Sequence, residues 1–180
     1  MEIVFETHAT SVDNEAGLAS GRADVDLSPA GERQAAELGR RRAAEHLDVV
    51  YVSDLRRSWR TAEIAFAGTS LPIVRDPRLS ECDYGAMTQR PAADVAAARA
   101  AFVAARFPGG ESYEEAVARV ASWLDAALGR RHTRVLVIGH RATHYALEHL
   151  LGGIALAEAV RTPFVWQPGW IYRRGTARSG

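Results

Sequence analysis

The chain has 180 residues, a length that suits one domain with a sizeable buried core. Its 22 basic and 22 acidic residues cancel, so no overall field should attract nucleic acid or an anionic membrane, and any anion site must be local. The one cysteine, Cys82, excludes an internal disulfide, and the N-terminal residues lack the basic and apolar regions of an export signal. No run approaches the ~18 apolar residues of a membrane span. We therefore expect a cytoplasmic globular protein.

Short runs of β-branched and apolar residues predict the strands of a sheet. Three of them, "EIVF", "DVVYV" and "RVLVI", are typical of parallel strands buried on both faces and occupy residues 2–5, 48–52 and 134–138. A shorter strand is expected at 71–75, and two candidate closing strands at 164–167 and 170–174.

Helical patterns lie between these runs. Ser28 suits an N-cap and Pro29 the first helical position, so a helix should begin there. Further helices are predicted at 56–68, 91–107, 112–131 and 141–151, whereas residues 76–90 are rich in helix- and strand-breaking residues and predict an irregular loop. Strands that alternate with helices indicate an α/β sandwich in a single domain.

Two histidines each follow a predicted strand directly. His8 comes just after the first strand, and His140 follows "RVLVIG". Because side chains beyond the carboxyl ends of parallel strands meet at one crevice, the two imidazoles should face each other there. The alternative is that each is an ordinary polar residue that closes a strand and binds a backbone carbonyl.

Two charged residues are further candidates for the same crevice. Arg57, with Arg56, lies in the first turn of the helix predicted at 56–68, where free backbone N–H groups and a guanidinium suit a phosphate. Glu81 lies in the irregular loop, where a carboxyl group can serve as a proton donor. The alternatives are a solvated arginine and a surface carboxylate.

Five segments of the chain resemble the motifs of the histidine phosphatase superfamily, also called the phosphoglycerate mutase-like superfamily, and they occur in the order found in that family. They are "THATS", "SDLRRSWRTA", "LSECDYG", "FPGGESY" and "VLVIGH", at residues 7–11, 53–62, 79–85, 107–113 and 135–140. The resemblance extends from residue 2 to about residue 152. One segment alone would be weak support, but five in the family's order are specific.

The resemblance implies a three-layer α/β/α sandwich around a mostly parallel sheet, in one domain over residues 1–180 with a small cap at about 82–113. It implies that the phosphoryl group passes through His8 as a phosphohistidine. Glu81 would protonate the leaving alkoxide and then activate water. The groups implied around the phosphoryl oxygens are Arg57, His140, Asn14 and Ser11. No metal and no cofactor is implied.

The sequence departs from the family pattern at residue 7. Members carry an arginine there that contacts the phosphate, whereas Thr7 offers one hydroxyl group. Arg141 follows His140 where the family has a small residue, and Arg22 lies in the loop after the first strand. Either arginine is a candidate to replace the missing charge.

These features favour a metal-independent phosphatase that acts on a small phosphomonoester, its expected partner, with a homodimer left open. A mutase of the same family is an alternative, although mutases carry a longer cap that would not fit this length. The second alternative is a catalytically weakened protein that binds a phosphorylated ligand and regulates another process, which Thr7 favours. A metal site on "HRATH", 140–144, is disfavoured because Arg141 stands where the zinc-peptidase pattern needs glutamate.

Overall fold

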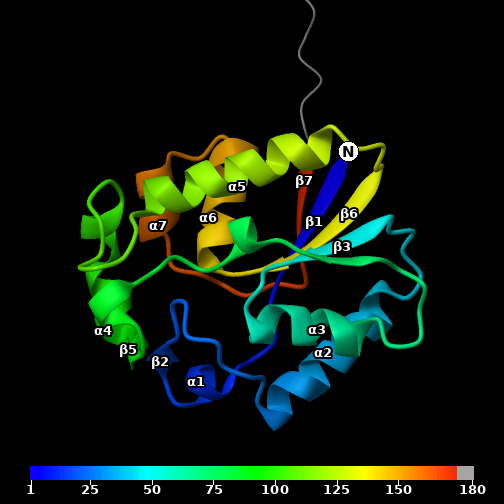
Figure 1. The fold of residues 1–180 in the computed structure, drawn as a ribbon, viewed down its shortest axis with the longest axis horizontal. Coiled ribbons are helices and arrows are strands. Elements are labelled where there is room, and N and C mark those ends of the chain that lie inside the picture. The colour runs from blue at the N-terminus through cyan, green and yellow to red at the C-terminus, as the bar shows by residue number, and fades with distance from the viewer. Residues whose placement is uncertain (174–180) are drawn as a thin grey trace, which may run out of the picture.

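The apolar runs form one five-stranded sheet in the computed structural model, which describes residues 1–173 (Figure 1). Four strands are parallel, and the last one adds to the edge in the antiparallel sense. In spatial order the strands are β4 (Ile73–Arg75), β3 (Val49–Val52), β6 (Arg134–Gly139), β1 (Glu2–Thr7) and β7 (Trp170–Arg173). The mostly parallel sheet confirms the expected α/β class.

Alternate strand residues pack against two separate helical layers. Ile3 and Phe5 of β1 belong to the core cluster under α5 (Tyr113–Leu128), α6 (Arg141–Leu150) and α7 (Leu156–Arg161). Val4 points the other way, into a cluster with side chains of α2 (Pro29–Arg42) and α3 (Arg56–Ala65). Figure 1 shows the two layers on opposite faces of the sheet. No helix formed by residues 1–173 is long and apolar enough to cross a bilayer.

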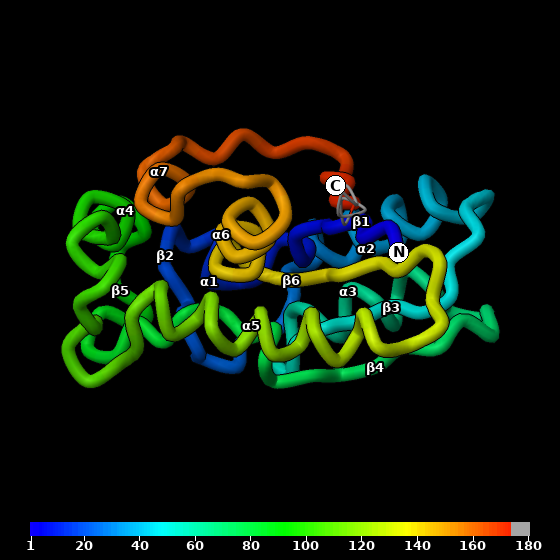
Figure 2. Tube along the Cα trace, turned by 90° about the horizontal axis from the view of Figure 1, so that it is seen from above, coloured from blue at the N-terminus to red at the C-terminus, as the bar shows by residue number. Residues whose placement is uncertain are grey.

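Several short elements gather at one end of the molecule. They are α1 (Val12–Glu15), the two-stranded ladder of β2 (Leu18–Ala19) with β5 (Arg90–Pro91), α4 (Ala92–Ala98) and the 3-10 turns η2 (Gly85–Met87) and η3 (Arg99–Phe102). A further 3-10 turn, η1 (Pro77–Leu79), packs against α5. Figures 1 and 2 place α4 and β5 beyond the end of the sheet, beside β2. The loop predicted at 76–90 is irregular as expected, apart from its two 3-10 turns and Arg90, which begins β5.

Two expectations differ from the structure. Residues 164–167 form no strand; Pro163 and Pro168 border the segment, and neither proline has an N–H group to donate to a ladder. The helix predicted over 91–107 ends at Ala98 and continues as η3. The strand expected at 170–174 is present as β7 over Trp170–Arg173, and Arg174 lies outside the described residues.

The crossing of α2 and α3 depends on a glycine. A Cβ atom on Gly39 would collide with the backbone carbonyl of Ala65. Gly39→Ala should therefore lower the free energy of unfolding by about 2 kcal/mol, although alanine is favoured by ~1 kcal/mol in an open helix. Urea unfolding measures this effect. The matched control is Gly129→Ala. Its Cβ atom would lie 3.6 Å from the nearest neighbour, and the backbone φ of −71° suits alanine, so this variant should have almost unchanged stability. Equal losses of stability in both variants would contradict the steric explanation.

Candidate active site

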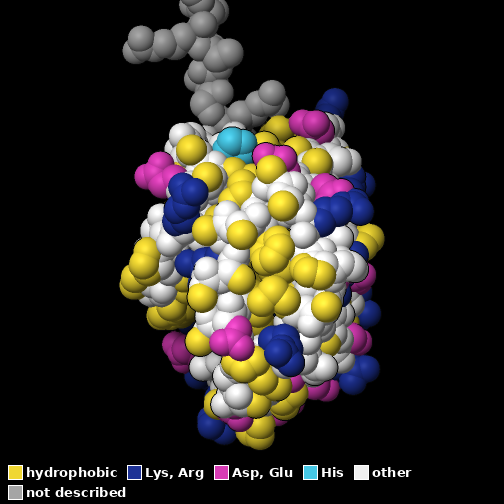
Figure 3. Space-filling view, turned by 90° about the vertical axis from the view of Figure 1, so that its left-hand side faces the viewer, with side chains coloured by type: hydrophobic (Ala, Val, Ile, Leu, Met, Phe, Trp, Pro, Cys, Tyr) yellow, Lys and Arg dark blue, Asp and Glu magenta, His cyan; other side chains and the backbone are white. Residues whose placement is uncertain are grey.

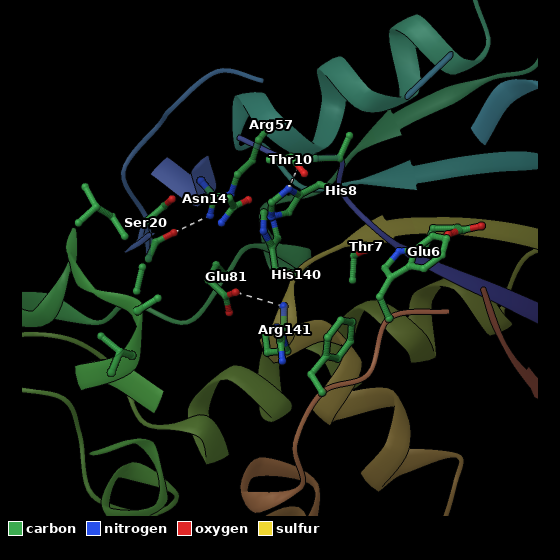
Figure 4. A pocket seen from close by; sticks show the side chains of 18 of the residues that line it. Glu6, Thr7, His8, Thr10, Asn14, Ser20, Arg57, Glu81, His140 and Arg141 are labelled. Carbon is green, nitrogen blue, oxygen red and sulfur yellow. Dashed lines mark hydrogen bonds between the residues drawn. The ribbon is translucent and has the colours of Figure 1, made fainter. Parts of the chain in front are cut away.

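A cavity of about 910 Å³ opens at the carboxyl ends of β1, β3 and β6. Figure 4 shows the side chains that converge on it, and Figure 3 shows the face of the molecule that carries α4, where hydrophobic side chains gather along the middle between basic ones. The sequence-predicted residues on its wall are Thr7, His8, Asn14, Arg57, Glu81, His140 and Arg141. Seven of the nine candidates are thus brought together.

His8 is held in one tautomer by its neighbour. Its Nδ1 lies 2.7 Å from the carbonyl oxygen of Ala9, which can only accept, so Nδ1 carries the proton and Nε2 has a free lone pair. Burial is the largest cause that lowers the pKa of His8 to about 3; the charges of Arg57 and Arg141 act in the same direction, and the hydrogen bond to the Ala9 carbonyl opposes them. The imidazole is therefore neutral at physiological pH and can act as a nucleophile.

His140 lies beside His8, with ring centroids 5.0 Å apart. It is 1% exposed, and its Nε2 lies 2.6 Å from Ser53 Oγ. Its Nδ1 has no hydrogen-bond partner among the described residues. Burial lowers the pKa of His140 well below the usual range, and the positive charge of Arg57 adds to the effect. An unpaired polar nitrogen in a residue that lines a cavity is a candidate to bind a ligand there.

Arg57 supplies a buried positive charge from the first turn of α3. Its two terminal nitrogens donate to the carbonyls of Ala23 and Gly21, at 2.8 and 2.7 Å. These bonds tie the guanidinium to the loop that follows β2, and burial lowers its pKa while Glu81 opposes that shift. It forms no ion pair with residues 1–173, so its charge is available to an anion.

Glu81 lies at the N-terminus of α6. Its Oε2 accepts from the amide of Arg141 at 3.1 Å, and its Oε1 accepts from Ala142 at 3.0 Å and Cys82 at 2.8 Å. These amides are free because they start a helix and follow a turn. The carboxyl group is thereby fixed beside the two imidazoles, as Figure 4 shows.

Arg141 projects from the first turn of α6 to the cavity wall. Its guanidinium stacks on Phe164, with Cζ 3.7 Å from the ring centroid. Like Arg57, it forms no ion pair within the described part of the chain. Thr7, at the end of β1, lines the same cavity without a side-chain hydrogen bond to any residue of 1–173.

Ser11 and Arg22 are not on the cavity wall. Ser11 is fully buried and caps α1, where its hydroxyl accepts from the amide of Asn14. Arg22 forms an ion pair with Glu111 at 3.3 Å, and its Nε donates to the backbone carbonyl of Glu81 at 3.4 Å. Their positions make them supports for the loops that carry Asn14 and Glu81.

Sequence reasoning missed part of the wall. Ser20 has a buried hydroxyl group with no partner among residues 1–173, and Phe164 and Trp166 come from the segment expected to be a strand. Arg41 also lines the cavity, but it donates to buried Glu6 at 3.0 Å. The polar composition of the loop around Ser20 was the one feature of the sequence that could have placed a missed residue at the cavity. Phe164 and Trp166 could not be predicted, because their segment reaches the cavity only in the folded chain.

His140 and His144, at the start of α6, lie in different surroundings. His144 packs among the rings of Phe5, Phe164 and Trp170. His140 instead forms a hydrogen bond with Ser53. Residues 1–173 contain no group of three His, Cys, Asp or Glu side chains placed to hold a metal ion.

The cavity thus brings together a neutral imidazole, two guanidiniums without an ion-pair partner among residues 1–173, and a fixed carboxyl group, which are the kinds of group that phosphoryl transfer uses. The sequence profile of the histidine phosphatase superfamily (branch 1) matches residues 3–169. The chain belongs to this superfamily.

Individual relatives include both mutases and phosphatases. The protein named "Probable phosphoglycerate mutase GpmB" of Erwinia tasmaniensis is 32% identical over 78% of this chain and 69% of its own length. Phosphoserine phosphatase 1 of Hydrogenobacter thermophilus is 30% identical over 88% of this chain and 79% of its own. YhfR of Bacillus stearothermophilus is 21% identical and has the same fold, with a TM-score of 0.81 over 94% of this chain and 89% of that one.

The lowered pKa of His8 has a consequence for stability. In the unfolded chain a histidine has a pKa of about 6.5, so between that pH and about 3 the unfolded state binds the additional proton and stability falls as the pH falls. His8→Asn removes one such group and should reduce this loss by at most about 1.4 kcal/mol per pH unit below pH ~6. Urea unfolding at several pH values measures the two slopes, and parallel slopes would contradict the prediction.

Proposed function

We propose that this protein is a metal-independent phosphatase that hydrolyses a small phosphomonoester through a phosphohistidine on His8. The observation that carries the proposal is the Ala9 carbonyl on His8 Nδ1, which leaves a neutral Nε2 lone pair in a cavity with two unpaired guanidiniums. We assign the reaction to the cytoplasm, in line with the single free cysteine, Cys82.

In the first step, Nε2 of His8 attacks phosphorus while the bond to the leaving oxygen breaks. The guanidinium of Arg57 and the free N–H groups of Asn14 meet the charge on the phosphoryl oxygens, because both residues line the cavity beside His8. Glu81, as the carboxylic acid, gives its proton to the leaving oxygen, so the leaving group departs as an alcohol.

In the second step, the carboxylate of Glu81 takes a proton from a water molecule, whose oxygen attacks phosphorus. The bond between phosphorus and His8 Nε2 breaks, inorganic phosphate forms, and the neutral imidazole returns. The three backbone amides on Glu81 hold its carboxyl group in place for both proton transfers. Neither step calls for a metal ion.

Thr7 leaves this cradle without one of the family's charged contacts. Such a loss is worth on the order of 2 to 4 kcal/mol in the transition state, or tens to several hundred fold in rate. Arg141 is the replacement that the geometry favours over Arg22, because Arg141 lines the cavity unpaired whereas Arg22 is paired with Glu111 outside it. The same substitution favours the alternative of a weakened enzyme that binds a phosphorylated ligand.

Loss of the proposed nucleophile should abolish turnover. His8→Gln should reduce hydrolysis of phosphomonoesters to background, with no acid-labile phosphoenzyme, because Nε2 accepts the phosphoryl group in the first step. A panel of metabolite phosphates, assayed with a chelator present, measures it. The matched control is His149→Gln, since His149 also has its Nδ1 on a backbone carbonyl, 2.9 Å from Ile154, but lies outside the cavity.

Activity that survives in the His8 variant would overturn the mechanism. Phosphate binding without turnover in the wild type would favour the weakened binding protein, and conversion of one phosphoglycerate isomer into another would favour the mutase.

The two candidate arginines can be separated by vanadate affinity. Arg141→Gln should weaken vanadate binding by roughly 10- to 100-fold, because it removes an unpaired charge from the cavity wall. Arg22→Gln should leave the affinity within about 3-fold of the parent, since its partners are Glu111 and a backbone carbonyl. Calorimetry measures both, and an unchanged affinity in Arg141→Gln would show that Arg141 does not compensate for Thr7.

A further inference from the structure

We infer that Ser53 is a positioning residue that fixes the tautomer of His140, so that His140 donates a hydrogen bond to the phosphoryl group. The inference rests on the proposed function and assigns a role to a residue just outside the reacting atoms.

Ser53 reaches His140 because of strand register. Val52 at the end of β3 pairs with Ile138 of β6, so the residues that follow the two strands leave the sheet side by side. Ser53 is fully buried, and its backbone amide donates to Ser58 Oγ at 3.1 Å, which in turn donates to the Ile138 carbonyl at 2.7 Å. The Ser53 backbone is therefore tied to β6 through the Ser58 hydroxyl group, which fixes the point from which the Ser53 side chain reaches His140.

The hydrogen bonds of Ser53 Oγ decide the direction of its bond to His140. The amide of Leu55 donates to this oxygen at 3.2 Å, so one lone pair is used. The hydroxyl proton has one acceptor within reach among the described residues, His140 Nε2 at 2.6 Å. Donation from Ser53 makes Nε2 the bare nitrogen of a neutral imidazole, and the ring proton must then be on Nδ1.

The opposite tautomer would leave two groups unsatisfied. If Nε2 carried the proton, the Ser53 hydroxyl proton would have no acceptor among residues 1–173, in a site without solvent access. Nδ1, which is buried and has no partner among the described residues, would then hold an unpaired lone pair in a residue that lines the cavity, and it would repel a phosphoryl oxygen placed beside it. With the proton on Nδ1, both problems disappear.

The two imidazoles thus have the same tautomer but opposite roles. The Nδ1–H group of His8 donates to the Ala9 carbonyl, so its Nε2 presents a lone pair. The Nε2 of His140 accepts from the Ser53 hydroxyl group, so its Nδ1 is left as an N–H donor. Ser53 prevents His140 from competing with His8 as a nucleophile, and gives the cradle a neutral donor at a place where burial and Arg57 oppose a second positive charge.

The tautomer can be measured without turnover. In protein labelled with ¹⁵N at histidine, the His140 resonances of the wild type should show Nδ1 protonated and Nε2 bare, with inorganic phosphate shifting the Nδ1 proton downfield. Ser53→Ala should move the proton wholly or partly to Nε2 and lower kcat/KM by roughly 10- to 100-fold, mainly in kcat. Ser53→Thr, which keeps the hydroxyl group, should restore the wild-type tautomer.

A matched control separates positioning from loss of stability. Ser112→Ala removes another buried serine hydroxyl, the N-cap of α5, and should lower the melting temperature without changing the His140 signals. A protonated Nε2 in wild-type His140 would overturn the inference even if Ser53→Ala does not fold, as would an unchanged tautomer in a folded Ser53→Ala protein. Failure of the phosphatase proposal is distinct, because it appears as turnover that survives in His8→Gln.

Discussion

The parallel pairing of β1 with β6 is the constraint on which the site depends. The register pairs Thr7 with Gly139, so the next residue of each strand is a histidine, and the amide of His8 donates to the Gly139 carbonyl at 3.0 Å. The pairing of these two strands is therefore enough to place the two imidazoles side by side. β3, on the other side of β6, adds Ser53 and then α3 with Arg57. A shift of one residue in the β1 register would bring a different side chain to the cavity.

Much of the fold follows from local patterns in the sequence. The three apolar runs became β1, β3 and β6, and Ser28 with Pro29 begins α2 as expected. The pattern was misleading at 164–167, because aromatic and β-branched residues favour strands in general but lie here on a connection bordered by prolines. The six-residue helix α7 is too short for helical periodicity to identify.

The site could be predicted where a residue follows a strand or begins a helix, as with His8, His140 and Arg57. The direction of a side chain could not be predicted from the sequence. Arg22 and Arg141 were both candidates to replace the missing charge, yet Arg22 pairs with Glu111 and Arg141 stacks on Phe164. That difference depends on which elements meet in space. Ser53 belongs to a matching motif, but its bond to His140 joins residues 87 apart in the chain.

The connection between α7 and β7 contributes part of the cavity wall from a segment that follows all the other wall residues in sequence. Phe164 and Trp166 lie on this connection, which Figure 2 shows running along one side of the molecule before β7 joins β1. During synthesis from the N-terminus, His8, Arg57 and Glu81 emerge long before the aromatic wall that supports Arg141. A nascent chain therefore holds His8 without its finished enclosure, and the cavity wall is complete only when the antiparallel edge strand has joined the sheet.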